Sequence, residues 1–360
     1  MPTDLFTSHT VGALALPNRV VMAPMTRSRA SADHIPTAIM AEHYAARADG
    51  GLLISEGTAP NVDGCGYPRI PGIWSEEQIS SWKVVTDAVH AAGGRIAIQL
   101  MHTGRVSHTL NMPEGATVLA PSAVPHASEK MYTDQSGLQD YPVPRAMTEA
   151  EVEASIEAFV SAARNARAAG FDAVELHGAN GYLIDQFLSP NTNQRDDRWG
   201  GDREGRSRFA LEVARRVAEA IGADRLGIRL SPGGRFNGIE PWDSVGPDFV
   251  WLTRKLGALG LAFLHIVDLV SMGGPEVPDA LKAELREAFP GTVILSGGYD
   301  RARADADLAA GKGDLVAFGR AFLANADLVT RLREGSSLNA ADMDTFYTPG
   351  PEGYNDYPTL

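Results

Sequence analysis

Three polar side chains that could act together on one small molecule stand within the six residues from His177 to Tyr182. The apolar alternation of residues 173–176 predicts a short strand that His177 would close, and the apolar spacing after Tyr182 predicts a helix. In a helical turn His177 and Asn180 would share a face, so both could donate hydrogen bonds to one ligand oxygen. The phenol of Tyr182, with an ordinary pKa of ~10, stays protonated at neutral pH and could deliver a proton.

The same residue types also have ordinary structural uses, which the triplet alone does not exclude. A histidine at the end of a strand often bonds the neighbouring backbone, an asparagine before a helix often caps it, and a helical tyrosine is often partly core. The predicted elements around the triplet must therefore show whether these residues have a chemical or a structural role.

Eight strand-like runs alternate with amphipathic helical stretches along the chain. The strand-like runs are residues 20–23, 52–56, 95–100, 173–177, 226–230, 263–267, 293–296 and 315–318. The helical stretches include 37–48, 76–92, 148–169, 203–221, 242–259, 278–289, 302–310 and 320–333, and Thr148 with Glu151 forms a capping box. Eight strands, most followed by a helix, favour an α/β fold of the (β/α)8 TIM barrel type over an open doubly wound sheet, in one domain spanning residues 1–360.

Three irregular segments would complete the barrel. The glycine-punctuated run 10–16 predicts a hairpin with the strand at 19–23, which would cap one end of the barrel. Two long segments rich in Pro, Gly, Asn and charge, 102–147 and 189–202, are predicted as loop insertions after strands. Because both follow the C-terminal end of a strand, the face where barrel enzymes keep their chemistry, we expect them to wall a cavity.

The composition narrows the classes of partner. The 360 residues carry a formal net charge of −13, which argues against a nucleic-acid or anionic-membrane surface. A single cysteine, Cys65, excludes an internal disulfide and a cysteine-based metal cluster, and we expect no metal site. The N-terminal residues lack the pattern of a signal peptide, and no window reaches the ~18 apolar residues of a membrane span. We therefore expect a soluble cytoplasmic protein, monomeric or homodimeric, that acts on small molecules.

Glycines and one arginine follow the last two predicted strands, where barrels often bind phosphate. Gly297 with Gly298 would let the backbone approach an anion closely, and Gly319 with Arg320 would open the final helix with a planar cation. A flexible turn and an ordinary helix cap would explain the same residues. In a barrel, however, both positions lie on the rim that carries function.

Gln99 and Arg229 stand at two other strand ends. A carboxamide can pair with donor and acceptor atoms of a planar heterocycle, and the guanidinium could neutralise an anionic ring. With Pro24 and Gly57 close to the plane of that ring, these residues suggest a phosphorylated flat cofactor, a description that FMN fits. The chain has no Gly-x-Gly-x-x-Gly motif after a first strand, so a dinucleotide bound in Rossmann fashion is not expected.

Seven runs of the sequence carry a resemblance to a known family. They are NRVVMAPMTRSRA, YAARADGGLLISEGT, QLMHTGR, GFDAVELHGANGYLIDQFLSP, GIRLSP, DLVAFGR and the terminal EGYNDYPTL. The chain resembles the Old Yellow Enzyme family, especially its bacterial branch of N-ethylmaleimide reductases and pentaerythritol tetranitrate reductase. The resemblance implies FMN on a (β/α)8 barrel and two half-reactions. NADPH or NADH reduces the flavin, and the flavin reduces an electron-poor alkene (enone, enal, maleimide or nitroalkene), a nitro compound or a nitrate ester.

The resemblance also implies a role for each residue of the site. His177 and Asn180 would bind the carbonyl or nitro oxygen, and Tyr182 would protonate the α-carbon as flavin N5 gives hydride to the β-carbon. Thr26, Gln99 and Arg229 would bond the flavin at O4, at its pyrimidine edge and near N1, in that order. Ala23, Pro24 and Gly57 would contact the isoalloxazine, Gly297, Gly298, Gly319 and Arg320 the phosphate, and Tyr67, Met101 and Tyr347 the substrate.

Three positions bear on the branch and on the substrate range. Asn180 stands where many relatives have His, and an amide can still donate. Thr26 stands where the thermophilic-like branch carries Cys, which argues against that branch. Met101 stands where the bacterial branch commonly has Trp, so we expect a wider pocket that accepts bulky substrates. Residues 128–137 would instead keep the pocket small if they folded inward.

Two other functions remain open on the same barrel. A phosphosugar isomerase or aldolase would want a Schiff-base lysine or a carboxylate base at a strand end, and lysines are sparse there. A flavin-storage protein would not need the triplet of His177, Asn180 and Tyr182.

Overall fold

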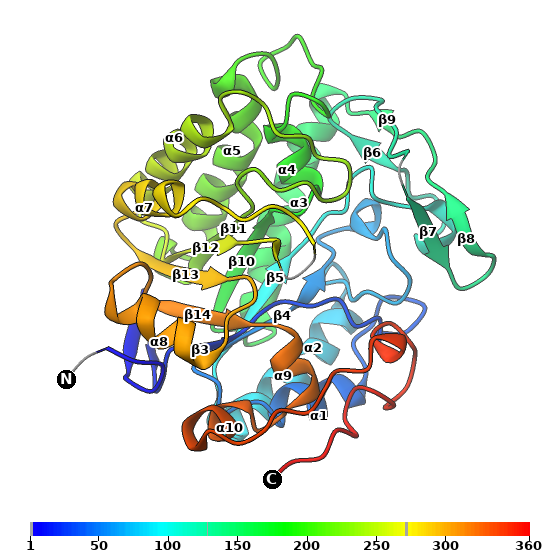
Figure 1. The fold of residues 1–360 in the computed structure, drawn as a ribbon. Helices are drawn as coiled ribbons and strands as arrows, with labels where there is room; N and C mark the ends of the chain where they lie inside the picture. Colours follow the sequence, from blue (N-terminus) through cyan, green and yellow to red (C-terminus); the bar gives the residue numbers. More distant parts are fainter. Residues whose placement is uncertain (1–2, 128, 271–272) are drawn as a thin grey trace.

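Eight parallel strands close into a barrel in the computed structural model, which describes residues 3–127, 129–270 and 273–360 (Figure 1). The strands are β3 (Val20–Met22), β4 (Leu52–Thr58), β5 (Ile96–Leu100), β10 (Ala173–Gly178), β11 (Leu226–Leu230), β12 (Phe263–Val267), β13 (Thr292–Ser296) and β14 (Leu315–Phe318). Their order around the barrel follows the chain, and β14 pairs with β3 to close it. The predicted (β/α)8 barrel is confirmed.

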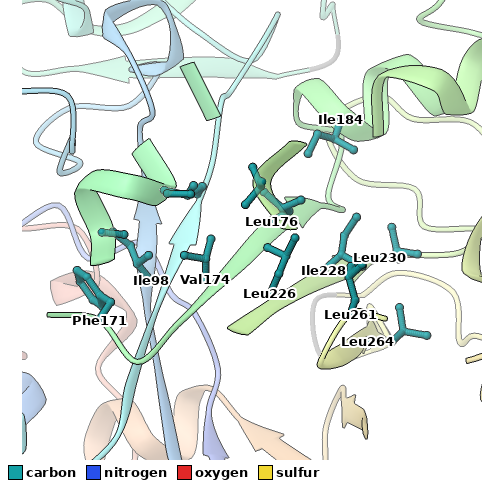
Figure 2. Close-up of a cluster of buried hydrophobic side chains, with 14 of the residues drawn as sticks. Ile98, Phe171, Val174, Leu176, Ile184, Leu226, Ile228, Leu230, Leu261 and Leu264 are labelled. Carbon is teal, nitrogen blue, oxygen red and sulfur yellow. The ribbon is translucent and has the colours of Figure 1, made fainter. Parts of the chain in front are cut away.

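Alternate residues of the strands face two different environments. Val174 and Leu176 of β10 belong to the same apolar core as Ile228 and Leu230 of β11 and the helices outside the barrel (Figure 2). The intervening Glu175 hydrogen-bonds side chains of β5 and β12 across the barrel interior. Because both faces of every strand are buried, the strands appear in the sequence as short, nearly continuous apolar runs.

Helices surround the barrel (Figure 1). They are α1 (Ala38–Ala45), α2 (Glu76–Ala91), α3 (Glu149–Ala168), α4 (Leu183–Leu188), α5 (Arg203–Ile221), α6 (Val245–Ala258), α7 (Asp279–Ala288), α8 (Arg301–Ala309), α9 (Arg320–Ala324) and α10 (Leu328–Glu334). The capping box at Thr148 and Glu151 is confirmed. Within the described ranges, no helix has the length and apolar character that crossing a membrane requires.

The helix predicted at 320–333 is in fact two helices. The chain is extended at Asn325, between α9 and α10. The Asn325 side chain donates to the carbonyl of Ala321 at 2.8 Å and accepts from the N–H of Asn339 at 2.8 Å. These bonds tie the break to the following segment, which a helical periodicity cannot reveal.

The N-terminal hairpin pairs differently from the prediction. β1 (His9–Val11) pairs with β2 (Leu14–Leu16), and the strand predicted as its partner is instead the barrel strand β3. The prediction was wrong because β14 and β3, and β3 and β4, already share their backbone hydrogen bonds, so β3 has no free edge. Val11, Leu14 and Leu16 pack against inward residues such as Phe263, so the hairpin does cap one end of the barrel.

The first long insertion contains regular structure that the sequence did not indicate. β7 (Lys130–Thr133) and β8 (Gly137–Asp140) form an antiparallel hairpin that projects to one side of the barrel (Figure 1). β6 (Leu119–Ala120) pairs with β9 (Arg145–Ala146). The prediction of a loop was therefore wrong in this part of 102–147. The second insertion, 189–202, contains no helix or strand along its fully described length.

Candidate active site

A cavity of about 390 Å³ lies at the C-terminal ends of the barrel strands. Most of the predicted site residues line it. They are Ala23, Pro24, Thr26, Gln99, Met101, His177, Asn180, Tyr182, Arg229, Gly297, Gly298, Gly319, Arg320 and Tyr347. Gly57 and Tyr67 do not line the cavity and contact residues that do. The fold thus brings together side chains that the sequence scatters from Ala23 to Tyr347.

A left-handed turn places Asn180 beside His177. β10 continues to Gly178, and Asn180 has φ 59°, so the predicted helical turn is wrong. The Asn180 N–H donates to the Ser231 hydroxyl at 3.0 Å, and its carbonyl accepts from the Asn237 side chain at 2.8 Å. Asparagine tolerates this backbone conformation better than most residues. The turn leaves Asn180 Oδ1 buried without a partner among the described residues.

His177 presents a hydrogen-bond donor to the cavity. Burial, reinforced by the nearby Arg229 cation, holds the pKa of His177 well below its usual value, so the imidazole is neutral. Its Nδ1 accepts from the N–H of Ala179 at 3.4 Å. A neutral imidazole that accepts at Nδ1 carries its proton on Nε2. Nε2–H is therefore the atom that His177 can offer to a ligand.

Tyr182 stands at the N-terminus of α4 with its hydroxyl 3.1 Å from the hydroxyl of Tyr67. Its ring packs edge-on against His177, with centroids 4.9 Å apart. Burial raises the pKa of Tyr182 to about 12, so the phenol keeps its proton throughout the physiological range. Tyr67, predicted to contact the substrate, is not among the residues that line the cavity and is the hydrogen-bond partner of Tyr182.

Gly57 provides space for Met101. A Cβ at Gly57 would lie 2.6 Å from the Met101 sulfur, so a larger residue would push that side chain away. Met101 is buried in one cluster with Tyr182 and with Met131 of β7. Met131 lies within 128–137, of which residue 128 is outside the described residues, and its buried side chain packs into this cluster although the hairpin as a whole projects from the barrel. This packing supports the expectation of a small pocket, and the wide pocket that Met101 alone suggests stays the alternative prediction.

Gln99 and Arg229 line the cavity from β5 and β11, the two strands that flank β10. The amide of Gln99 donates from Nε2 to Glu175 Oε1 at 2.8 Å. Arg229 is mostly buried, and its Nε has no partner in the part of the chain that the structure describes. A buried guanidinium with an unsatisfied donor is costly unless a ligand pairs with it. The residues present therefore fit an electron-rich or anionic ring above them.

The glycines predicted to hold a phosphate have the required backbone freedom. Gly297 has φ 119° and Gly298 has φ 67°, a region that residues with a side chain rarely adopt. A Cβ at Gly297 would also lie 2.4 Å from the Cβ of Asp268. Gly319 precedes α9, and the first residue of α9, Arg320, is exposed. In a chain of net charge −13 this arginine is a local cation on the cavity wall.

Sequence reasoning missed the arginines that hold the C-terminal segment at the cavity. Arg27 donates from Nε to the carbonyl of Phe346 at 3.1 Å and from Nη2 to that of Gly353 at 2.6 Å. Arg29 donates to four carbonyls between residues 345 and 352. This anchoring carries Tyr347 to the cavity. A contact between segments more than 300 residues apart leaves no local pattern in one sequence, although Arg27, Arg29 and residues 352–353 belong to the runs that carry the resemblance.

Other residues of the cavity wall were also not predicted. They are Met25, Arg27, Phe236, Val267, Asp268, Ser296, Tyr299, Ala317, Phe318, Ala321, Leu323 and Phe346. Several directly neighbour a predicted residue in the sequence, so the strand-end rule could have found them. Phe236 lies in the loop after β11, where only its apolar character within a polar segment gave any signal.

Comparisons with known proteins agree with this geometry. Residues 4–339 match the model of the NADH:flavin oxidoreductase / NADH oxidase family. Chanoclavine-I aldehyde reductase of Penicillium roqueforti (strain FM164) is 45% identical over 367 residues, which cover 99% of this chain and 96% of that protein. A structure of morphinone reductase has a TM-score of 0.96 at 43% identity, covering 100% of this chain and 97% of that one, and another of its structures holds tetrahydroNAD. The Old Yellow Enzyme homologue of Zymomonas mobilis has a TM-score of 0.94 at 40% identity, covering 99% of this chain and 100% of that one.

Proposed function

The chain belongs to the NADH:flavin oxidoreductase / NADH oxidase family as an NAD(P)H-dependent FMN enzyme of the Old Yellow Enzyme type, and we propose that it reduces the activated double bond of enones, enals, maleimides and nitroalkenes. When bound, FMN would supply the redox chemistry, the transfer of hydride from NADPH or NADH to the β-carbon of the alkene. The residues of the cavity supply binding, orientation and a proton.

His177 and Asn180 would bind the substrate oxygen. The neutral His177 offers Nε2–H, and the Asn180 side chain offers its amide N–H from a turn fixed by Ser231 and Asn237. As the β-carbon accepts hydride, negative charge develops on the carbonyl or nitro oxygen. Donors that are already aimed at that oxygen stabilise the charge without having to reorganise. Two donors also suit a nitro group, so nitro compounds and nitrate esters fall within the proposed range.

Tyr182 would protonate the α-carbon. Its phenol remains protonated because burial raises its pKa to about 12, and it lines the same cavity as the two oxygen-binding residues. Tyr67 lies 3.1 Å from the Tyr182 hydroxyl. If Tyr67 donates to that oxygen, the Tyr182 proton points away from Tyr67 and is available to the substrate. The same donor stabilises the phenolate that forms when the proton leaves.

The cofactor would be held by residues from five of the barrel strands and the loops after them. Arg229 would place its buried positive charge under the electron-rich ring, and Gln99 would meet the pyrimidine edge. Thr26, Ala23 and Pro24 would contact the ring from the loop after β3. Gly297, Gly298, Gly319 and Arg320 would surround the phosphate with backbone N–H groups and one cation.

The observation that carries this proposal is one cavity that combines a cation under a ring site with two oxygen-directed donors and a protonated phenol. A spectrum of the purified protein tests it. We expect flavin absorbance that bleaches on addition of NADPH or NADH under anaerobic conditions and returns on addition of cyclohexenone. Bleaching without recovery by any enone or nitroalkene would remove the alkene reductase assignment.

The same experiment separates the two alternatives. A flavin-storage protein would show flavin absorbance without rapid turnover between NAD(P)H and an enone. A phosphosugar isomerase or aldolase would neither be bleached by NAD(P)H nor need the Tyr182 hydroxyl. The flavin-storage alternative leaves the His177–Tyr182 geometry without a use, and the isomerase or aldolase alternative also leaves without a use the Arg229 Nε that has no partner among the described residues.

A further inference from the structure

A buried polar cluster lies inside the barrel, and one of its members lines the cavity. It consists of Glu175 on β10, His265 on β12 and Gln99 on β5. Glu175 accepts from His265 Nδ1 at 2.8 Å with one oxygen and from Gln99 Nε2 at 2.8 Å with the other. Glu175 and His265 are both 0% exposed. Burying an ionisable pair is a poor way to stabilise a core, so the cluster calls for a reason other than packing.

The cluster fixes which atom Gln99 offers to a ligand. An ionised carboxylate can only accept hydrogen bonds, so Gln99 must turn its amide nitrogen toward Glu175. The carbonyl oxygen of Gln99 is then the atom left for the cavity, which Gln99 lines. A ligand edge placed against it must bring a donor, and the imide N–H of a flavin is one. Without Glu175 the amide could present either end.

The cluster also holds a negative charge close to Arg229. Burial lowers the pKa of His265, so at neutral pH its imidazole is neutral and donates its Nδ1 proton to Glu175 without cancelling the charge. In the strand register, Arg229 stands next to both His177 and His265, and the attraction of Glu175 acts on its guanidinium. Arg229 Nε has no hydrogen-bond partner within the described chain, so the guanidinium remains able to donate to a ligand above it.

We propose that Glu175 is a positioning residue for the flavin: together with His265 it orients the Gln99 amide and sets the charge below the pyrimidine ring, and so sets the reduction potential. The proposal rests on the proposed placement of FMN over Gln99 and Arg229. A reduced flavin carries more negative charge than an oxidised one. The carboxylate of Glu175 therefore opposes reduction and partly offsets the stabilisation that Arg229 provides.

Two substitutions separate the effect of the Glu175 charge from the effect of the Gln99 amide orientation. In Glu175→Gln the new amide still accepts from Gln99 with its oxygen and donates with its nitrogen to His265 Nδ1, once the neutral imidazole carries its proton on Nε2 instead, so the shape is kept and the charge is lost. In Glu175→Leu the charge and both hydrogen bonds are lost. Asp172→Asn is the matched control, because Asp172 stands just before β10 at the opposite end of the barrel, where it bonds His90 at 2.9 Å.

The readouts are the midpoint potential of the bound FMN, titrated against reference dyes, and the dissociation constant of oxidised FMN. We expect Glu175→Gln to favour reduced over oxidised flavin by about tenfold or more, which is about 30 mV upward for a two-electron couple. Its affinity for oxidised FMN should change by less than that factor. Glu175→Leu should raise the potential and also weaken FMN binding, and Asp172→Asn should change neither.

An unchanged potential in Glu175→Gln holoprotein would overturn the proposal, as would a loss of FMN from Glu175→Gln with the potential of the retained flavin unaltered. Neither result depends on the substrate. If wild-type protein failed to reduce any enone, the proposed function would fail while the potentials would still decide the role of Glu175.

Discussion

The pair of tyrosine hydroxyls at the cavity provides the sharpest test of the proposed proton transfer. Tyr182→Phe removes the phenol that would protonate the α-carbon, and removing a general acid typically costs ~10²- to 10⁴-fold in rate. Water can enter a cavity of about 390 Å³, so a loss near the small end of that range is expected. Only the reduction of the alkene should slow, because reduction of the flavin by NAD(P)H needs no proton on a substrate carbon.

Tyr67→Phe should slow the same step through Tyr182. Its hydroxyl lies 3.1 Å from the Tyr182 hydroxyl, where it can stabilise the developing phenolate. A hydrogen bond to a charged group contributes ~1.5–3 kcal/mol, which sets a ceiling of roughly 10- to 150-fold on the loss. If Tyr67 acts only through Tyr182, adding Tyr67→Phe to Tyr182→Phe should change the rate by no more than about twofold.

Stopped-flow measurement of the two half-reactions, with cyclohexenone as the substrate, tests this double-mutant cycle of Tyr67→Phe and Tyr182→Phe. Tyr141→Phe is the matched control: Tyr141 packs against the same apolar cluster, and no hydrogen bond from its hydroxyl to Tyr182 is present in the described residues. Wild-type alkene reduction should show no ionisation of Tyr182 between about pH 6 and about pH 10, since the phenol must lose its proton only near its raised pKa of about 12. Equal slowing of both half-reactions would remove Tyr182 from its role, and an additive cycle would show that Tyr67 acts independently.

Three further outcomes test the rest of the site. Heat denaturation should release free FMN into the supernatant, because the single cysteine, Cys65, is fully buried and offers no covalent attachment; colour retained in the precipitate, or released FAD, would contradict this. His177→Ala should weaken binding of a phenol ligand by roughly 10- to 150-fold, measured by the charge-transfer band of the complex. In the wild type the affinity for the phenol should not change near pH 6.5, because the pKa of His177 lies well below that value. Met101→Trp should lower kcat/KM for cyclohexenone and for a 3-substituted analogue alike, because the indole meets the buried Met131 of the same cluster, and Met131→Ala should relieve the loss. Selective loss on the bulky substrate would instead support the wide pocket.

The barrel could be predicted from the sequence because its strands are buried on both faces. Each run is short and mostly apolar, and most are followed by a polar residue or glycine on the rim where the cavity forms. The hairpin of β7 and β8 gave a weaker signal: it is four residues on each side, and only alternate residues of β7 are buried. Whether such a segment folds inward depends on the space beside Met101, which the sequence does not state.

The site could be predicted as a set of residues, and its geometry could not. His177 and Asn180 do line one cavity, but through a left-handed turn held by Ser231 and Asn237 from the loop after β11. Those partners are more than 50 positions away, so no periodicity near Asn180 could indicate them. The spacing of three residues suggested a helical turn only because local rules assume the commonest backbone conformation.

Glu175 is a site residue that was not predicted although the sequence contains a signal for it. It is the only charged residue in a strand that is otherwise apolar up to His177, and a charge inside a strand buried on both faces must find a partner. The candidates for that partner were inward residues on neighbouring strands, namely Gln99, already assigned to the cofactor, and His265, two residues past the start of β12. A buried charge that needs a partner therefore indicates a polar cluster inside the barrel, and Glu175 is the residue from which that cluster could have been predicted.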